Sequence, residues 1–406
     1  MLRYGRAMDR RFVMGVLLLT LATAACQPGR SGAPDPSRSA GDPASPDRTS
    51  EANVSDLQVP TVGWATDFTK ANVPLGDFRG GGPPKDGIPA IDNPRTESIA
   101  AAGDWLVDRA PVISLEIGGH ARAYPLGILI WHEIANDTLG GVPIVVTFCP
   151  LCNTALVFER QLDGTTYDFG TTGNLRYSDL VMYDRQTESW WQQATGGAIV
   201  GELTGAQLVF VPAQIVSFSA FAAAYPDGDV LSRATGFQRD YGRNPYVGYD
   251  DASTNPFLFE GVVDGRLAPK ERVVTVGTGD EAIAYPLSEL SKVGVATGSV
   301  DGAAIVVFWA PGATSALGPD TIGDGVDIGA SGVFQSLADG RALAFERPGG
   351  PDSPITDLET GSTWSITGLA TAGPLTGTQL TPVAHGDHFW FAWAAFSPQT
   401  TIWTAP

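Results

Sequence analysis

Positively charged residues, and lysine above all, are scarce in this sequence. Of the 406 residues, 25 are lysine or arginine and 44 are aspartate or glutamate, which gives a formal net charge of −19. Lysine occurs only at Lys70, Lys85, Lys270 and Lys292. A protein that binds nucleic acid needs basic side chains to neutralise phosphates. We therefore exclude nucleic acid as a partner.

Long apolar runs are also scarce, and the clearest one lies at the N-terminus. Basic residues precede an apolar run at 12–21, which ends in T-A-A-C at Cys26. The run is too short to span a membrane in the mature protein and is typical of a signal peptide. The cysteine after small residues resembles a bacterial lipobox, which would make Cys26 the lipidated first residue; an ordinary signal peptide is the alternative. Arg10 and Arg11 also fit a twin-arginine signal, so the export route stays open between Sec and twin-arginine.

These features predict an extracytoplasmic protein that is anchored to the cell membrane as a lipoprotein. Residues 1–26 would be the signal peptide. Residues 27–58 contain mostly Pro, Ser, Asp and Gly and almost no large apolar side chains. Such a segment cannot bury enough apolar surface to fold, so we expect a disordered tether.

The rest of the chain has a globular composition, with 43% hydrophobic residues and 17% charged residues. The 49 glycines and 30 prolines, together with many Val, Thr, Phe and Trp, favour turn-rich β structure. A chain of this length usually forms more than one core, so two domains or two halves are expected.

Internal matches indicate a duplication. C-P-L-C-N-T-A-L at 149–156 shares its frame with A-P-G-A-T-S-A-L at 310–317. The matching pairs are, in chain order, 121–126 with 282–287, 149–156 with 310–317, 168–173 with 327–332, 184–191 with 357–364, and 203–208 with 375–380. We therefore predict an α+β fold that is rich in strands, in which two copies of one strand-rich unit with short helices pack together. Copy one would span 59–236, a loop at 237–262 would link the copies, and copy two, without cysteines, would span 263–406.

Within copy one, the patterns predict two pairs of strands and two helices. Segments 112–117 and 121–124 flank a Gly-Gly turn and read as a hairpin. Two further strands, 143–148 and 154–160, would be joined by the C-P-L-C loop. Apolar residues at helical spacing predict helices over 126–136 and 218–224. The linking loop is long for a compact protein, and loops of that length are often functional.

The reactive side chains are confined to copy one. Cys149 and Cys152 correspond to alanines in copy two, and the other unshared residues are His132, Glu133, Arg185 and Glu188, which correspond to Val293, Gly294, Leu358 and Gly361. Positions that both copies keep, among them Asp168 and Asp184, are expected to serve the fold. The unshared positions are expected to serve a function.

Cys149 and Cys152 are the remaining thiols once Cys26 is lipidated. A C-x-x-C motif can be a redox dithiol, half of a metal site or a haem attachment. Asn153 stands where haem attachment needs histidine, so no covalent c-type haem is expected. A thioredoxin-type dithiol begins a helix, where the helix dipole lowers the thiol pKa. The residues after Cys152 alternate as in a strand, which favours a metal-thiolate site, with a redox dithiol and an inert disulfide in a binding module as alternatives.

His132 is the natural third ligand, although a histidine beside a tryptophan on a helix can also be an ordinary core residue. His120 follows a Gly-Gly turn and is expected to be exposed. His385 and His388 have the spacing of a ligand pair but fall in copy two, which makes them weaker candidates. A site with two thiolates and one imidazole suits zinc or copper, and soft thiolates on an exported protein favour copper somewhat.

Arg185 and Glu188 lie close in sequence to the paired tryptophans Trp190 and Trp191. They have two interpretations, a surface ion pair beside an aromatic core or a polar wall of the thiol site. In the second, they would act as outer residues that orient the metal ligands.

Several long motifs resemble a known family. They are W-H-E-I-A-N-D, V-T-F-C-P-L-C-N-T-A-L-V-F-E-R, S-D-L-V-M-Y-D-R-Q-T-E-S-W-W and T-G-F-Q-R-D-Y-G-R-N-P-Y. The chain, from about Asp86 to Thr400, resembles domain-of-unknown-function family 3179, an uncharacterised family of exported bacterial and archaeal proteins. The resemblance implies no established activity. It places His132, Cys149, Cys152, Asp179, Asp184, Arg185, Glu188, Arg239 and Tyr241 within signature segments. Asn153 departs from the glycine expected there, and its side chain would narrow the loop without excluding thiol chemistry.

The sequence thus predicts a metal site, for copper or zinc, formed by Cys149, Cys152 and His132. Asp179, Asp184, Arg185, Glu188, Arg239 and Tyr241 are expected around the site or at a bound substrate. The expected partners are the membrane, through the N-terminal lipid, and a protein that exchanges metal or electrons with the thiols.

Overall fold

The structure is a computed structural model that describes residues 53–406. The predicted signal peptide, Cys26 and most of the predicted tether lie outside the described residues. The end of that tether, 53–58, is described: it forms the 3-10 helix η1 (Val54–Asp56), and Leu57 packs on an aromatic cluster that includes Phe78 and Trp190. Among residues 53–406, no helix is both long enough and apolar enough to cross a membrane.

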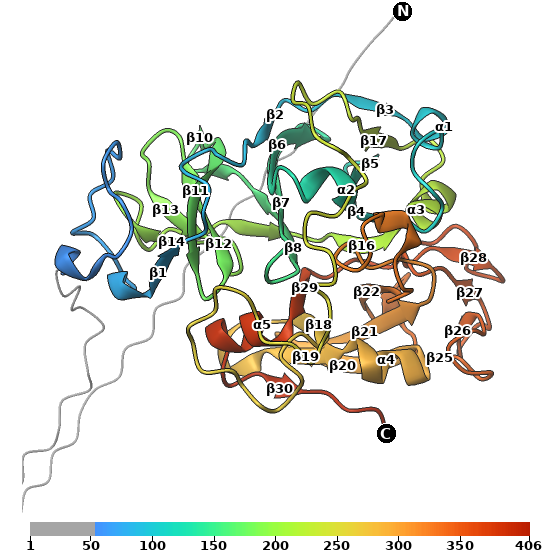
Figure 1. The fold of residues 1–406 in the computed structure, drawn as a ribbon. Helices are drawn as coiled ribbons and strands as arrows, with labels where there is room; N and C mark the ends of the chain where they lie inside the picture. Colours follow the sequence, from blue (N-terminus) through green and yellow to red (C-terminus); the bar gives the residue numbers. More distant parts are fainter. Residues whose placement is uncertain (1–52) are drawn as a thin grey trace, which may run out of the picture. The chain divides into compact units, whose positions relative to one another are not determined.

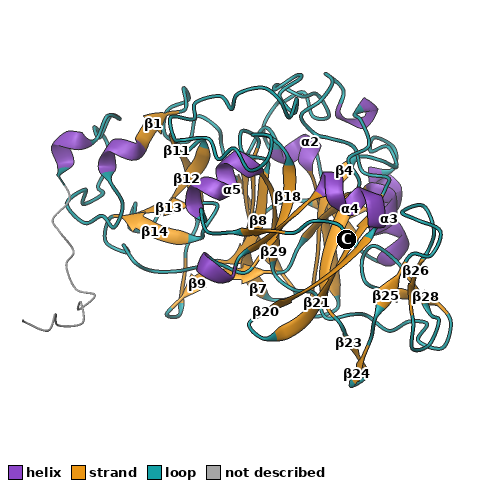
Figure 2. Ribbon diagram, turned by 90° about the horizontal axis from the view of Figure 1, so that it is seen from below, coloured by secondary structure: helices purple, strands orange, loops and turns teal. Residues whose placement is uncertain are grey.

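Strands dominate the described part of the chain, as Figure 1 and Figure 2 show. The largest sheet contains segments from both ends of the described sequence. Its strands, in spatial order, are β2 (Ile91–Asp92), β6 (Ile134–Leu139), β7 (Val142–Cys149), β8 (Thr154–Glu159), β29 (His385–Phe389), β18 (Arg272–Val276), β19 (Ile283–Pro286) and β30 (Thr401–Ile402), with β15 (Val209–Val211) also paired to β8. The pairing of Asp387 with Ala155 joins β29 to β8, so the two halves of the sequence meet in one sheet.

Two five-stranded sheets are formed by the first half. One consists of β1 (Phe78–Gly80), β11 (Phe169–Arg176), β12 (Asp179–Asp184), β13 (Trp190–Gln192) and β14 (Gly197–Val200). The other consists of β16 (Gln214–Ser217), β4 (Pro111–Ile117), β5 (His120–Pro125), β17 (Asp229–Leu231) and β3 (Thr96–Ser98). A small hairpin adds β9 (Gln161–Leu162) and β10 (Thr165–Thr166).

The second half forms the smaller sheets. Three strands make one of them, β20 (Val295–Val300), β21 (Ala303–Ala310) and β22 (Ala330–Gln335). Four make another, β25 (Phe345–Glu346), β26 (Ile355–Asp357), β27 (Thr363–Trp364) and β28 (Ala370–Ala372). A hairpin consists of β23 (Leu337–Ala338) and β24 (Arg341–Ala342).

The helices are short. The α-helices are α1 (Ile99–Ala102), α2 (Leu126–Leu129), α3 (Phe218–Ala224), α4 (Leu287–Val293) and α5 (Trp390–Phe396). The other 3-10 helices are η2 (Leu75–Asp77), η3 (Gly279–Glu281) and η4 (Ile322–Asp324). A β-rich chain with short helices is therefore confirmed.

The local predictions around the thiols are confirmed in part. The hairpin β4–β5 turns at Gly118 and Gly119, which have φ of 60° and 83°; such a turn suits glycine. The strands on either side of the C-P-L-C loop are β7 and β8, and the helix at 218–224 is α3. The helix predicted over 126–136 is wrong beyond Leu129, because Glu133 has a φ of 59° and β6 begins at Ile134.

The strand register corrects two of the internal matches, the second half of 149–156 with 310–317 and the whole of 168–173 with 327–332. Cys149 ends β7 opposite Thr154 of β8, and Ala310 ends β21 opposite Ala330 of β22. The strand that returns beside β21 therefore starts at 330, and a loop over 311–329 stands where the first half has only 150–153. Segment 327–332 lies at the start of this returning strand, so it does not occupy a position equivalent to 168–173 in β11.

Candidate metal centre

The thiol loop, residues 150–153, connects two strands that are buried in the largest core. Cys149 is the last residue of β7, and its backbone pairs with Thr154 at the start of β8. The short connection is possible because Asn153 takes a left-handed conformation with a φ of 52°. Only 1% of Cys149 and none of Cys152 is exposed. Both thiols are therefore sealed from solvent between two β-strands, and neither begins a helix.

Asp179 is the acidic residue that the fold brings to the thiols. The Cys152 Sγ donates a hydrogen bond to Asp179 Oδ1 at 3.0 Å, and the Cys149 Sγ contacts the Ser178 carbonyl at 3.7 Å. Asp179 begins β12, after Tyr177 and Ser178, whose φ values are 55° and 62°. That tight turn between β11 and β12 directs the fully buried Asp179 carboxylate toward the loop.

The second oxygen of Asp179 is also fully engaged. Asp179 Oδ2 accepts hydrogen bonds from Gln192 Nε2 at 2.5 Å and from the Ala194 backbone N–H at 2.9 Å. These two donors fix the carboxylate plane, so that Oδ1 remains directed at Cys152. A carboxylate held in this way would be preorganised as a ligand, because its orientation would not have to be set when an ion binds.

One ligand atom from each of Cys149, Cys152 and Asp179 lies within 4.8 Å of the others, so that among residues 53–406 this group could hold a metal ion. Two sulfurs and one oxygen at these separations can converge on a single ion at Zn–S and Zn–O distances of roughly 2.0–2.3 Å after small side-chain adjustments.

Electrostatics support the same interpretation. Burial raises the pKa of Asp179 to about 6, against hydrogen bonds that lower it. Burial also raises the pKa of Cys149, and raises that of Cys152 well above its usual range. Glu133 is buried nearby, and burial, followed by the charge of Asp179, raises its pKa to about 8. Burial therefore favours the neutral, protonated forms of these four groups. A bound cation would favour their ionised forms instead.

His132 is not a ligand of this group, so that prediction is wrong. Its Nδ1 lies 2.7 Å from the Pro89 carbonyl oxygen, and its Nε2 lies 2.7 Å from the Tyr241 hydroxyl. Both ring nitrogens are therefore used in hydrogen bonds to other segments. The imidazole ties the 237–262 loop to the first half instead of reaching the thiols.

The two histidines of the second half do not form a ligand pair. They lie on β29, where residues three apart point to opposite faces of the strand. His388 Nδ1 lies 2.9 Å from Thr154 Oγ1, and His385 Nδ1 lies 2.8 Å from the Val383 carbonyl. His120 is exposed, as predicted.

The structure does not bring Asp184, Arg185 or Glu188 to the thiols. Asp184 is at the far end of β12 from Asp179, about 16 Å away at the usual rise per residue, and accepts from Thr187 and Trp191. Arg185 pairs with Asp92 at 2.7 Å. Glu188 accepts from Lys85 Nζ at 2.5 Å and from the Ala65 N–H at 2.6 Å. These three residues stabilise the β12–β13 turn and its neighbours.

Arg239 and Tyr241 belong to the linking loop. Arg239 is exposed and donates to the Gln238 carbonyl. The Tyr241 hydroxyl contacts His132 and, at 2.5 Å, Thr235. Of the predicted outer residues, Asp179 is therefore the one that contacts a thiol, and it does so as a ligand candidate.

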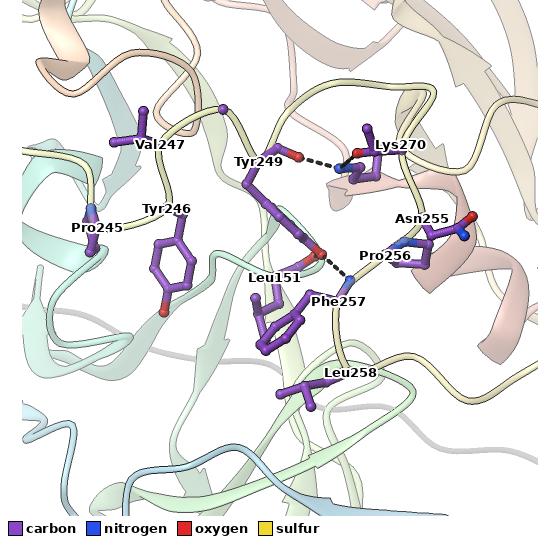
Figure 3. A pocket seen from close by; sticks show the side chains of 12 residues that line it. Leu151, Pro245, Tyr246, Val247, Tyr249, Asn255, Pro256, Phe257, Leu258 and Lys270 are labelled. Carbon is purple, nitrogen blue, oxygen red and sulfur yellow. Dashed lines mark hydrogen bonds between the residues drawn. The ribbon is translucent and has the colours of Figure 1, made fainter.

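The linking loop forms a pocket above the thiol loop (Figure 3). The pocket has a volume of about 570 Å³, and Leu151 of the thiol loop lies on its wall with Tyr246, Tyr249 and Phe257. The Tyr249 hydroxyl donates to the Leu151 carbonyl at 2.9 Å and accepts from the Phe257 N–H. Leu151 is thus the residue of C-P-L-C that lines this pocket.

The comparison with known families confirms the family that the sequence motifs resemble. Residues 85–400 match the family described as "Protein of unknown function (DUF3179)". The chain belongs to the DUF3179 family. Within the DUF3179 region lie both thiols, Asp179 and the pocket. No curated protein and no solved structure matches the chain.

Proposed function

We propose that this DUF3179 protein binds a metal ion through Cys149, Cys152 and Asp179, with zinc as the ion. The observation that carries the proposal is the buried group itself, in which two sulfurs and a carboxylate oxygen lie within 4.8 Å of one another. Without a cation, burial disfavours ionisation of all three side chains. A dication would compensate the ionised ligands, and both thiols would lose their protons on binding.

The donor set favours zinc over copper. Sulfur and oxygen donors together suit borderline Zn²⁺, whereas the softer Cu(I) prefers an all-sulfur or sulfur–imidazole site. This reverses the preference for copper that two thiolates alone suggest. Three protein donors leave one position of a tetrahedral site to a fourth ligand.

Metal analysis of the purified full chain tests the proposal. We expect about one zinc ion per wild-type chain and much less in Cys149→Ser and Asp179→Asn. His132→Gln is the matched control. His132 is also a buried polar residue of the first half, but it does not belong to the group formed by Cys149, Cys152 and Asp179. The proposal fails if wild type and Cys149→Ser contain equal, substoichiometric metal, or if only His132→Gln loses zinc.

A thiol–disulfide oxidoreductase remains the alternative function. Cys149 and Cys152 are free and adjacent in the loop, so they could close a disulfide. Their burial and raised pKa values weigh against it, because exchange requires an accessible thiolate. Rapid reduction of a protein disulfide by the dithiol, with no zinc in the wild type, would favour this alternative.

The duplication is part of the proposal, and the strand pairings support it. β4 pairs antiparallel with β5 and β16, while β5 pairs parallel with β17. β18 pairs in the same senses with β19 and β29, while β19 pairs parallel with β30. One turn also recurs: Trp191 Nε1 donates to Asp184 Oδ2 at 3.0 Å, and Trp364 Nε1 donates to Asp357 Oδ2 at 3.0 Å.

Export and lipid attachment at Cys26 also belong to the proposal and rest on the sequence alone. The mass of the mature N-terminal peptide tests them: a diacylated cysteine at position 26 is expected, and an unmodified N-terminus would contradict the assignment.

A further inference from the structure

The second half of the chain contains no cysteine, yet its residues and those of the linking loop form hydrogen bonds to three of the four residues of the thiol loop. The Leu151 carbonyl accepts a hydrogen bond from the Tyr249 hydroxyl, and the Cys152 carbonyl accepts one from the Phe389 N–H at 2.8 Å. Beside the loop, Thr154 Oγ1 forms a hydrogen bond with the His388 ring. Between these contacts, Asn153 Oδ1 accepts from Arg272 Nη1 at 2.6 Å. The loop that carries the thiols therefore has its conformation set from residues far along the sequence.

Arg272 is the charged member of this set. It is the first residue of β18, and its side chain is 11% exposed. Its Nη2 donates to Ser315 Oγ at 2.7 Å and lies 3.7 Å from Asp250 Oδ2, while its guanidinium stacks over the Phe389 ring at 5.0 Å. One side chain thus joins the thiol loop to the linking loop and to the 311–329 loop.

The bond to Asn153 fixes a backbone conformation that the site depends on. Asn153 follows Cys152 directly and has a φ of 52°, which an L-residue adopts at some cost unless its surroundings hold it there. The planar guanidinium offers separate N–H groups at fixed angles, so it can hold Asn153 and Ser315 at once. A lysine in this position would carry the positive charge but would lack the planar set of N–H donors at fixed angles.

We propose that Arg272 is a positioning residue for the metal centre, through which the second half sets the geometry of the Cys149–Cys152 loop. The proposal rests on the proposed metal site. It assigns a role to the half that lacks thiols: the ligands come from the first half, and the conformation that makes them converge is set by the second. Arg272 acts through Asn153. Among the hydrogen bonds of residues 53–406, none joins Arg272 to the sulfur of Cys149 or of Cys152.

Zinc affinity of the full chain, measured by competition with a chromophoric chelator, tests this role. We expect Arg272→Gln to weaken zinc binding about 10- to 100-fold, the usual effect of losing a residue that orients a ligand. Arg272→Lys should recover part of the affinity. Asn153→Gly removes the same bond from the other side, while glycine tolerates the positive φ, and it should weaken binding similarly even if Arg272→Gln folds poorly.

Arg122→Gln is the matched control. Arg122 is 14% exposed, pairs with Asp137 and Asp229, and makes no hydrogen bond to residues 149–154 among the described contacts. Loss of Arg122 should lower stability and leave zinc affinity unchanged. Wild-type affinity in both Arg272→Gln and Asn153→Gly would overturn the proposal, and so would equal weakening in Arg122→Gln, since that would reflect stability alone.

A second readout separates this inference from the metal site. The rate at which iodoacetamide modifies Cys149 and Cys152 in the metal-free chain reports how firmly the loop is held. We expect about a tenfold faster rate in Arg272→Gln than in Arg122→Gln, as expected when an opening equilibrium shifts by about 1.4 kcal/mol. If the wild type binds no zinc, the proposed function fails, and with it the role of Arg272 at a metal centre. A faster modification rate in Arg272→Gln would then still show that Arg272 positions the thiol loop, and equal rates would overturn that as well.

Discussion

His388 should make the stability of this protein sensitive to acid. Its side chain is 1% exposed, it contacts Thr154 through Nδ1, and its ring packs on Trp393 with centroids 4.9 Å apart. Burial, followed by the charge of His385, lowers the pKa of His388 from 6.5 to about 3. The folded protein therefore keeps this imidazole neutral at pH values where the unfolded chain protonates it.

The sign and size of the effect follow from linkage. Between the folded pKa and the unfolded pKa, the unfolded chain binds one more proton, so the free energy of unfolding falls as the pH falls. The slope is about 1.4 kcal/mol per pH unit for one group. The contribution of His388 is complete above pH 6.5, and about 2 kcal/mol of it is lost by pH 5.

Urea unfolding of wild type and His388→Gln at pH 7.5 and pH 5.0, with a chelator present to remove metal linkage, measures this contribution. The wild type should lose about 2 kcal/mol more than the variant between the two pH values. His132 and His385, whose pKa values are also lowered by burial, are present in both chains and cancel in the comparison. Equal losses in the two chains would refute the account of a buried neutral His388.

Two further predictions concern stability. Trp191→Phe and Trp364→Phe each remove an indole donor from a buried aspartate and should lower the free energy of unfolding by about 1–3 kcal/mol; urea unfolding should give similar losses, and a loss in only one variant would contradict equivalent turns. Arg122→Met leaves the buried Asp137 without its cationic partner and should cost about 3–5 kcal/mol in the same assay, whereas wild-type stability would show that the ion pair contributes nothing.

The strands around the thiol loop could be predicted because their pattern is local. Most residues of 143–148 and 154–158 are apolar, and nearly all of them are buried within one sheet. The helix predicted over 126–136 ends at Leu129, and the positive φ of Glu133 leaves no mark in apolar spacing. The match of 149–156 with 310–317 is wrong in its second half. Both segments end in A-L, and this shared ending gives no sign that the loop of the second half continues to 329.

The thiols themselves could be predicted from their absence in the second half, but the carboxylate beside them could not. Asp179 is distant from Cys152 in sequence, and a turn at Tyr177 and Ser178 brings it to the site. His132 was the more conventional ligand, and its two nitrogens are instead used by Pro89 and Tyr241. Residue type identifies both Asp179 and His132 as possible metal ligands. Only the structure of the β11–β12 hairpin shows that Asp179, and not His132, lies beside Cys152.

X-ray absorption at the zinc edge of the zinc-loaded full chain tests the central claim most directly. The account predicts two sulfur neighbours at about 2.3 Å and oxygen or nitrogen neighbours at about 2.0–2.2 Å. In Asp179→Asn the sulfur shell should persist with fewer or weaker light-atom neighbours, and in Cys149→Ser it should shrink. A zinc ion without sulfur neighbours, or one whose surroundings are the same in all three chains, would contradict a site formed by Cys149, Cys152 and Asp179.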